Sequence, residues 1–205
     1  MSNALQSATF TASDAALRAM YAARKSVFVD LLNWDVPVLD GRYELDQFDD
    51  AHARYLILAE PDGSHFGSAR LLPTTRPHIL DSFYAGLCDD APPRGEAIFE
   101  ITRFCLDRRL SARERRAVRD TLVAGLAAYA LANGITAYTA IAARGWFQQI
   151  AGFGWDCRPL GPSRTIAGAP LAAMRIEITP ETPDLLAAGG IVPICALPHP
   201  QPAAA

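Results

Sequence analysis

Seven charged residues lie in segments whose neighbours are mostly hydrophobic. They are Arg24, Glu44, Asp46, Asp49, Arg70, Glu100 and Arg103. Charged side chains rarely enter a protein interior unpaired, so we expect these groups to bind each other or a charged substrate. Glu100 and Arg103 share the strand-like segment FEITRF, and an offset of three points strand side chains to opposite faces. A bulge or a strand end is therefore required if both are to reach one cleft.

Two roles are open for this charged set. It can bind and activate a charged substrate, or it can form a buried ion-pair network that only holds a loop in place. The histidines do not decide between these roles, because they are scattered among loops and turns without the spacing of metal ligands. They are His52, His65, His78 and His199. We expect all four on the surface and predict no metal site.

The order of the charged and aromatic residues forms a motif. Residues 24–49 read R-x-x-x-F-x-x-x-x-x-W and then E-x-D-x-x-D, and the blocks GSARLLPTTRPHIL and FEITRF follow. This succession resembles the acyl-homoserine-lactone synthase family of bacterial autoinducer synthases. Nine positions match in order: Arg24, Phe28, Trp34, Glu44, Asp46, Asp49, Arg70, Glu100 and Arg103. The resemblance extends over residues 20–160, and the C-terminal part of the chain matches nothing specific.

The resemblance implies an α/β fold similar to the N-acetyltransferases, a single domain whose mixed sheet is flanked by helices and opens into a cleft between splayed strands. It also implies two substrates, S-adenosylmethionine and an acyl thioester on acyl carrier protein or coenzyme A. The family acylates the amine of S-adenosylmethionine. The substrate carboxylate then attacks the γ-carbon and expels methylthioadenosine, which leaves an N-acyl-homoserine lactone, a quorum-sensing signal. S-adenosylmethionine is a substrate here, so no cofactor is expected.

The family positions give each matched residue an expected role. Catalysis is assigned to Glu44, Asp46, Arg70, Glu100 and Arg103, and S-adenosylmethionine binding to Arg24, Phe28, Trp34, Asp46, Asp49 and Arg103. The acidic loop attracts the cationic substrate, and Trp34 can hold its sulfonium by a cation–π contact, whereas Phe28 also suits core packing. We expect a carboxylate base acting directly or through one water, with Glu44 the first choice and Asp46 the second. A backbone N–H near Phe104 or Cys105 is expected to meet the thioester oxyanion.

Residues of the central strands and of a short helix are expected to line the acyl pocket. The set is Ile101, Thr102, Leu122, Leu126, Thr139, Ile141, Trp146, Phe147 and Ile150. Thr139 resembles a position at which some family members carry threonine and favour 3-oxo chains. One hydroxyl or methylene contributes only ~1–3 kcal/mol to discrimination, so no chain length is predicted.

A run of arginines lies at the start of a predicted helix. It consists of Arg108, Arg109, Arg113, Arg115, Arg116 and Arg119. A solvated helix face is one interpretation of such a run. The other is a docking surface for an acidic acyl carrier protein, with Arg109, Arg113 and Arg116 as the contacts. Both interpretations stay open.

These side chains must be positioned by elements that the pattern also predicts. We expect a helix over residues 14–32, an irregular connection over 34–50, and a hairpin of strands 53–60 and 66–73 around a turn at 61–64. Further strands are expected at 97–106, 135–142 and 171–179, and further helices at 111–133, at 145–151 and after Pro183. The capping box Ser111–Glu114 and Gly134 bound the longest helix. Early hairpins followed by interleaved helices favour a mixed sheet with helices packed on it.

The composition narrows the class of protein. A chain of 205 residues with a formal net charge of −3 is expected to form one domain and to bind neither nucleic acid nor an anionic membrane surface. We place that domain at residues 1–197 and a disordered tail at 198–205. The four cysteines form no C-x-x-C pair and are expected to be reduced. Without a signal-like N-terminus or a membrane-spanning stretch, the protein is predicted to be cytoplasmic, with no membrane insertion.

Two other functions compete with the synthase. A simple N-acyltransferase of the same fold would use coenzyme A thioesters and form no lactone. Such enzymes carry a Gln/Arg-x-x-Gly-x-Gly/Ala loop for the pyrophosphate, and the nearest segments here, 144–146 and 151–154, lack its spacing. A non-catalytic ligand-binding relative is the second alternative, and the presence of every charged motif position argues against it.

Overall fold

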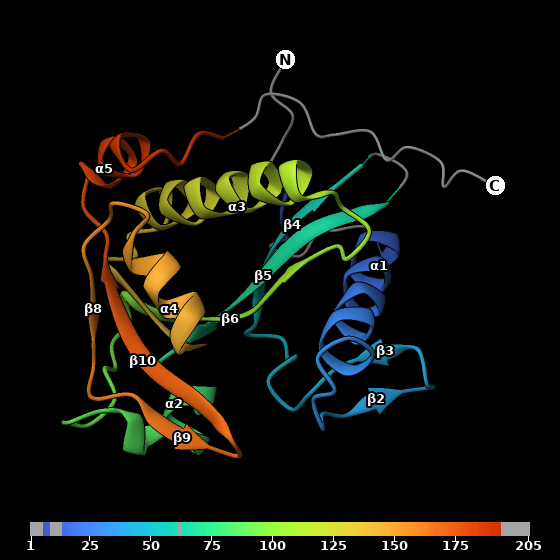
Figure 1. Cartoon of the computed structure of the whole chain (residues 1–205), viewed down its shortest axis with the longest axis horizontal. Helices are drawn as coiled ribbons and strands as arrows, with labels where there is room; N and C mark the ends of the chain where they lie inside the picture. The colour runs from blue at the N-terminus through green and yellow to red at the C-terminus, as the bar shows by residue number, and fades with distance from the viewer. Residues whose placement is uncertain (1–5, 9–13, 61–62, 194–205) are drawn as a thin grey trace.

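The computed structural model describes residues 6–8, 14–60 and 63–193 (Figure 1). Its elements are β1 (Gln6–Ala8), α1 (Asp14–Arg24), the π-helix η1 (Lys25–Val29), β2 (Val38–Leu39), β3 (Tyr43–Glu44), β4 (Arg54–Ala59), β5 (His65–Pro73), α2 (Ile79–Phe83), the 3-10 helix η2 (Ala85–Leu87), β6 (Ile98–Leu106), α3 (Ala112–Ala132), β7 (Ala137–Ala143), α4 (Arg144–Ala151), β8 (Cys157–Pro159), β9 (Arg164–Ile166), β10 (Ala169–Glu177) and α5 (Thr182–Ala188). The predicted domain end at residue 197 and the predicted tail lie outside the described residues.

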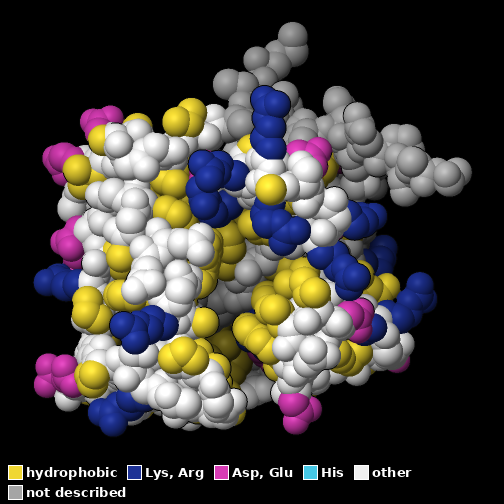
Figure 2. Space-filling view, viewed as in Figure 1, with side chains coloured by type: hydrophobic (Ala, Val, Ile, Leu, Met, Phe, Trp, Pro, Cys, Tyr) yellow, Lys and Arg dark blue, Asp and Glu magenta, His cyan; other side chains and the backbone are white. Residues whose placement is uncertain are grey.

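One mixed sheet forms the centre of the molecule. Its strands run in the order β1-β4-β5-β6-β7-β10-β8, with β9 paired to β10, and β6 and β7 are its parallel pair. Their register ends at Ile101 opposite Ala140, although β6 continues to Leu106 and β7 to Ala143. The two strands therefore separate and leave a wedge. In Figure 2 a hollow with hydrophobic walls lies between the half that carries α4 and β10 and the half that carries α1.

Helices cover both faces of the sheet, as expected for this fold class (Figure 1). Leu122 of α3 belongs to the main core cluster on one face. Met20 of α1 packs against Tyr55 of β4 on the other face. Leu80 of α2 forms a third cluster with Ala173 of β10. The sheet is thus the middle layer of three.

The longest helix begins and ends at the predicted signals. The Ser111 hydroxyl accepts from the Glu114 amide, and the Glu114 carboxylate accepts from the Ser111 amide. Gly134 follows the helix with φ at 66°, the left-handed conformation that commonly ends helices. This capping satisfies amides that would otherwise lack partners at the start of α3.

Several short features differ from the sequence expectation. The first predicted helix changes from α to π geometry at residues 25–29. The connection predicted to be irregular contains the hairpin of β2 and β3, in which Asp40 and Gly41 both have positive φ, at 52° and 63°. The elements α2, η2, β8 and β9 were not predicted, and α5 begins at Thr182, before Pro183. Elements this short show too little periodicity for a pattern to reveal them.

Candidate active site

A β-bulge in β6 aims Arg103 into the site. The register between β5 and β6 shifts so that Arg103 and Phe104 together oppose the single residue Ala69. Arg103 has φ at 51°, a left-handed conformation that costs an L-residue free energy. The extra residue turns the side chain toward the face that carries Glu100. The sequence required such an irregularity for the two residues to share a cleft.

Arg24, the last residue of α1, is held by two carboxylates. Its Nε donates to Glu44, and its terminal nitrogens donate to the two oxygens of Asp49 at 2.8 Å each. The Tyr55 hydroxyl also donates to Asp49, at 2.8 Å, and accepts from the Tyr21 hydroxyl. Burial alone would raise the pKa of Asp49, but the hydrogen bonds from Arg24 and a second nearby guanidinium outweigh burial and hold this pKa well below its ordinary value.

Arg70 and Arg103 close the network from the sheet. Arg70 donates to both oxygens of Asp46, at 2.7 and 3.0 Å, and its Nε donates to the Thr102 hydroxyl at 2.9 Å. Arg103 donates twice to Glu44, at 3.0 and 2.9 Å, and once to Asp46 at 2.8 Å. Three guanidinium groups thereby neutralise three carboxylates through charge-assisted hydrogen bonds.

This network unites six of the seven charged residues that the sequence indicated, all except Glu100. Glu44, the first choice as base, is fully buried, and each of its oxygens accepts from a guanidinium group. The acid loop, which we define as residues 44–50, is therefore anchored to α1 and to both central strands. Of the two roles considered from the sequence, the structure shows the ion-pair network that holds the loop. The binding of a charged substrate by these residues stays a prediction.

Phe28 and Trp34 stack on each other beside Arg103. Their ring centroids are 4.7 Å apart with planes inclined by 14°, and the Arg103 guanidinium lies 5.7 and 5.8 Å from the two centroids. The chain reverses after η1 through Asn33, whose φ is 54°, and the Trp34 amide donates to the Phe28 carbonyl. Phe28 is buried, whereas Trp34 is 44% exposed, so the outer face of Trp34 is accessible to a ligand.

Glu100 lies on β6 outside the network. Its two oxygens accept from the amides of Ile79 and Leu80, at 2.8 and 2.9 Å. Burial raises the pKa of Glu100 to about 7, and these amides and the charges of Arg70 and Arg103 offset burial only in part. A carboxyl that titrates near neutral pH is suited to take up and release a proton.

Two buried polar atoms next to Glu100 have no hydrogen-bond partner among the described residues. They are Nε2 of His78 and the hydroxyl of Thr139. His78 precedes the residues whose amides hold Glu100, and Thr139 is the register partner of Glu100 on β7. Buried polar atoms usually have partners, so both offer unused hydrogen-bonding capacity beside this carboxyl.

The prediction that the histidines are on the surface is wrong for two of them. His65 and His78 are only 4% and 0% exposed. His65 begins β5, and His78 leads into α2, and the packing of these elements carries both rings inward. His52 is exposed as expected. His199 lies outside the described residues, as does Cys195.

The predicted acyl-pocket residues lie on both faces of the sheet around the wedge. The main core includes or contacts Ile101, Leu122, Leu126, Trp146, Phe147 and Ile150. On the other face, Thr102 accepts from Arg70, Thr139 is next to Glu100, and Ile141 packs on the α2 cluster. The rings of Phe104 from β6 and Trp146 from α4 are 5.9 Å apart.

Four arginines of the run at the start of α3 are exposed, and Arg115 and Arg119 are half-buried. Arg109 is 80% exposed but already bound to Asp107 at 2.6 Å. Arg119 binds Asp120 and lies over the Phe153 ring. Arg113 and Arg116 are exposed and form no ion pair with any described residue.

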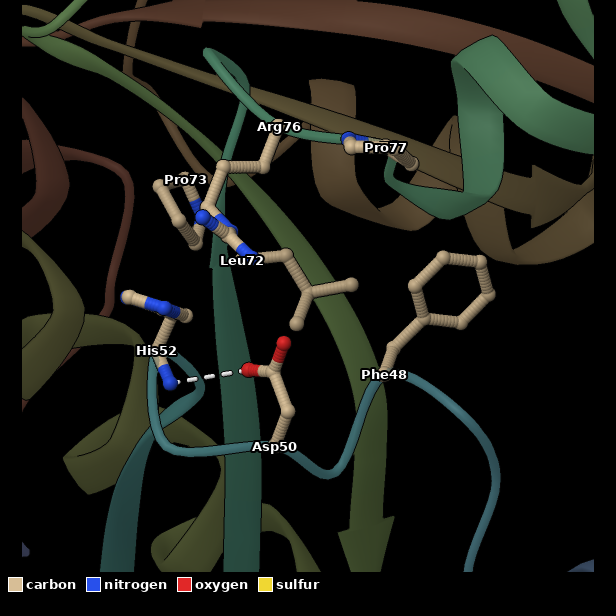
Figure 3. A pocket seen from close by; sticks show the side chains of 7 residues that line it. All are labelled: Phe48, Asp50, His52, Leu72, Pro73, Arg76 and Pro77. Carbon is tan, nitrogen blue, oxygen red and sulfur yellow. Dashed lines mark hydrogen bonds between the residues drawn. The ribbon is translucent and has the colours of Figure 1, made fainter.

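A small pocket separates the acid loop from the segment before α2. It encloses about 10 Å³, room for one water molecule. Figure 3 shows the residues that line it: Phe48, Asp50, His52, Leu72, Pro73, Arg76 and Pro77. None of these was predicted as a site residue.

Tyr55 is a site residue that sequence reasoning missed. It is the register partner of Arg70, and its hydroxyl fixes Asp49. The alternation in ARYLILAE places Tyr55 and Ile57 on one face, but only the pairing with β5 reveals that this face carries the network.

The part of the chain that the structure describes groups no three His, Cys, Asp or Glu side chains in a way that would hold a metal ion. None of its helices is long and apolar enough to cross a membrane. Cys88, Cys105 and Cys157 are free thiols.

Comparison with known proteins yields matches in sequence and in structure. Residues 9–182 match the family model of the autoinducer synthases. An acyl-homoserine-lactone synthase from Ralstonia solanacearum is 36% identical over 185 residues, which cover 86% of this chain and 88% of that protein.

The fold of this chain is similar to the folds of solved proteins. A CoA-dependent acyl-homoserine lactone synthase, BjaI, solved with SAM and isopentyl-CoA, matches with a TM-score of 0.76 at 28% identity, covering 85% of this chain and 82% of that one. An acyl-CoA N-acyltransferase from Pseudomonas aeruginosa matches with a TM-score of 0.54 at 16% identity, covering 80% of this chain and 92% of that one. The expected N-acetyltransferase-like fold is confirmed.

Proposed function

Because the chain belongs to the autoinducer synthase family, we propose that it transfers an acyl group from a thioester to the amine of S-adenosylmethionine and closes the product into an N-acyl-homoserine lactone. The network of three arginines and three carboxylates carries this proposal. It makes a rigid, neutral wall of charged groups at the mouth of a hydrophobic wedge. Such a boundary suits a reaction between a zwitterionic amino acid and a hydrophobic acyl chain.

Two bonds form and two break in this reaction. The neutral amine attacks the thioester carbonyl, and the thiol leaves with the proton that the amine loses. A carboxylate oxygen then attacks the γ-carbon, and the C–S bond breaks toward the sulfonium, so methylthioadenosine leaves uncharged. No redox step or metal takes part, and the chemistry requires no cofactor.

The acid loop and Trp34 suit the S-adenosylmethionine site. The outer face of Trp34 is open and can meet the sulfonium or the adenine. The guanidinium of Arg103 lies beside this ring and is 9% exposed, so it can bind the substrate carboxylate without leaving Glu44. This surface is held in place by the stacking of Phe28 on Trp34 and by the hydrogen bonds between Arg24 and Asp49.

Glu100 is better placed than Glu44 to act as the base. Both oxygens of Glu44 are occupied by guanidinium groups. Glu100 has a pKa raised by burial to about 7, and it lies beside the unpartnered hydroxyl of Thr139. A base of this pKa holds a proton for only part of the time at neutral pH, which suits removal of the amine proton and its later release. The bulge at Phe104 supplies the strand irregularity at which a free N–H can stabilise the oxyanion.

The acyl donor approaches from the arginine run. The capping box occupies the Ser111 and Glu114 amides, so these amides at the start of α3 do not bind a phosphate. Arg113 and Arg116 are free to meet an acidic acyl carrier protein or the phosphates of coenzyme A. Both donors and S-adenosylmethionine are cytoplasmic metabolites, and we place the reaction there.

Mass spectrometry of lactones extracted from expressing cells tests the function. We expect an N-acyl-homoserine lactone from the wild type and from the surface variant Arg18→Ala, and at least ~10²-fold less of it from folded Glu100→Gln. An in vitro assay for methylthioadenosine separates the alternatives. An acylated amine without methylthioadenosine would indicate a simple N-acyltransferase, and binding without either product would indicate a ligand-binding relative.

A further inference from the structure

The short helix α2 fixes the position of Glu100. The amides of Ile79 and Leu80 donate to the two oxygens of its carboxylate, at 2.8 and 2.9 Å. The N-cap residue His78 makes no side-chain cap, so Glu100 satisfies amides that a cap would otherwise satisfy. The orientation of the carboxylate therefore depends on where α2 lies.

Two contacts hold α2 in place. On its inner side Leu80 is fully buried and clusters with Leu87 and Ala173. On its outer side the Phe83 ring meets the Phe48 ring edge to face, with centroids 5.9 Å apart and planes at 81°. Phe83 is 61% exposed, whereas Phe48 is buried. Because the Phe83 side chain is largely exposed, it contributes little to the hydrophobic core. Its edge-to-face contact with Phe48 is therefore the feature that can give it a role.

The Phe48 contact connects α2 to the ion-pair network. The Phe48 amide donates to Asp46 at 2.9 Å, and the same carboxylate binds Arg70 and Arg103. Beside this contact lies the water-sized pocket, where the acid loop and the segment before α2 do not touch fully (Figure 3). The contact between Phe48 and Phe83 thus connects the acid loop to α2 where the packing between them is otherwise loose.

We propose that Phe83 is a positioning residue, whose contact with Phe48 keeps α2 docked on the acid loop and so holds Glu100 in place for proton transfer. This proposal rests on the proposed function and goes beyond it, because Phe83 is outside the family motif and its ring contact is with Phe48 of the acid loop. Loss of the ring would let α2 move away from the acid loop. Water would then reach Glu100, whose surroundings are otherwise His78, Thr139 and the charges of Arg70 and Arg103.

The test is the pH dependence of methylthioadenosine release between pH 5.5 and 9, with saturating donor. Since acid–base catalysis contributes ~10²–10⁴-fold, a misplaced but present base should lower kcat by ~10-fold in Phe83→Ala. Because burial is the main cause of the raised pKa of Glu100, hydration should move the acidic limb of the kcat profile to lower pH. The KM for S-adenosylmethionine should stay within ~2-fold, since Phe83 contacts Phe48 and Trp34 stacks on Phe28, so loss of the Phe83 ring removes no ring contact of Trp34.

Two further variants make the result decisive. Phe83→Tyr keeps the ring edge and should retain both the wild-type kcat and the wild-type profile. Leu185→Ala removes another exposed hydrophobic side chain, far along the chain on α5, and should also behave as wild type. A wild-type profile in Phe83→Ala, or equal losses in the Ala and Tyr variants, would overturn the proposal. Absence of methylthioadenosine from the wild type would instead overturn the proposed function.

Discussion

Glu44 and Glu100 are both fully buried carboxylates, yet their surroundings give them different tasks. Glu44 is enclosed by Arg24 and Arg103, so its charge is part of the structure. Glu100 accepts only neutral amides, and burial raises its pKa to about 7. The motif includes both residues, but only their contacts distinguish an anchor from a base.

Replacement of these two residues should therefore affect different measurements. Glu44→Ala removes one of the three carboxylates that balance the three guanidinium groups, so one buried positive charge is left uncompensated, although Arg24 keeps Asp49 and Arg103 keeps Asp46. The variant should lower the free energy of unfolding by about 3–5 kcal/mol. Glu100→Gln keeps an oxygen for the α2 amides and should fold, while kcat falls by ~10²–10⁴-fold. Urea unfolding and methylthioadenosine release check both, with exposed Glu96→Ala as the control. A stable Glu44→Ala protein that had lost only kcat would reverse the two assignments.

The exposed arginines should differ in their effect on the acyl donor, because some of them already have an ion-pair partner and others do not. Arg113 and Arg116 are free, whereas Arg109 is already held by Asp107. The double variant Arg113→Glu/Arg116→Glu should lower kcat/KM for an acyl carrier protein donor by ~10-fold or more at low salt, and added salt should reduce the difference. Arg109→Glu should have a smaller effect. Initial rates at several salt concentrations measure this, and equal effects of the double variant and of Arg18→Glu would exclude docking at this surface.

At the level of elements, the turn after η1 determines where Trp34 lies. Asn33 adopts φ of 54°, which glycine adopts freely and a β-branched residue strongly resists. Asn33→Val should displace Trp34 and raise the KM for S-adenosylmethionine several-fold, since a cation–π contact contributes ~0.5–2 kcal/mol. Asn33→Gly should bind like the wild type. Steady-state kinetics of both variants test this, and a Val variant with an unchanged KM would show that Trp34 does not need this turn.

Elements with strong local signals were predictable, and elements held by tertiary contacts were not. The capping box at Ser111 and the glycine at 134 defined α3, because both signals act within one turn of the helix. The helix α2 has only five residues, and its stability comes from Glu100 and the Leu80 cluster, which are distant in sequence. The same reason explains why His78 was wrongly expected at the surface.

In the site, too, one part could be predicted from the sequence and another could not. The order of charged residues in the motif was enough to indicate the network, because pairing of buried charges is obligatory. Which partner each residue takes depends on the bulge at Arg103 and on the β4–β5 register that brings Tyr55 to Asp49. Strand register is set by the whole sheet, so a sequence pattern could require the bulge without locating it.

For the whole molecule, the wedge between β6 and β7 has the neutral ion-pair network on one side and leads through β6 to the basic arginine run. The acid loop lies on the face with α1, and the arginine run follows β6 on the way to α3. The exposed arginines Arg113 and Arg116 would attract an anionic acyl donor to their side of the molecule, whereas the acid loop is neutralised by Arg24, Arg70 and Arg103. The function proposed above places the acyl group and the amine where the strands part, near Glu100 and the bulge.

The pH dependence of the free energy of unfolding is a property of the whole molecule. Two buried groups, His65 and Glu100, change it in opposite directions. Burial lowers the pKa of His65 to about 4, although Asp107 raises it in part, so between pH 6.5 and 4 the unfolded chain binds a proton that the folded protein does not. Stability then falls as the pH falls. Burial raises the pKa of Glu100 to about 7, so between pH 4.5 and 7 the folded protein holds a proton that the unfolded chain has lost, and stability rises as the pH falls.

These opposite dependences should nearly cancel in the wild type between pH 6.5 and 4.5, and single variants should reveal them. His65→Gln leaves Glu100 alone and should gain about 2 kcal/mol of unfolding free energy as the pH is lowered across this window. Glu100→Gln leaves His65 alone and should lose a similar amount. Urea unfolding at pH 4.8, 5.6 and 6.5 measures both slopes. Parallel curves for the two variants would mean that at least one of these groups titrates in the folded protein as it does in the unfolded chain.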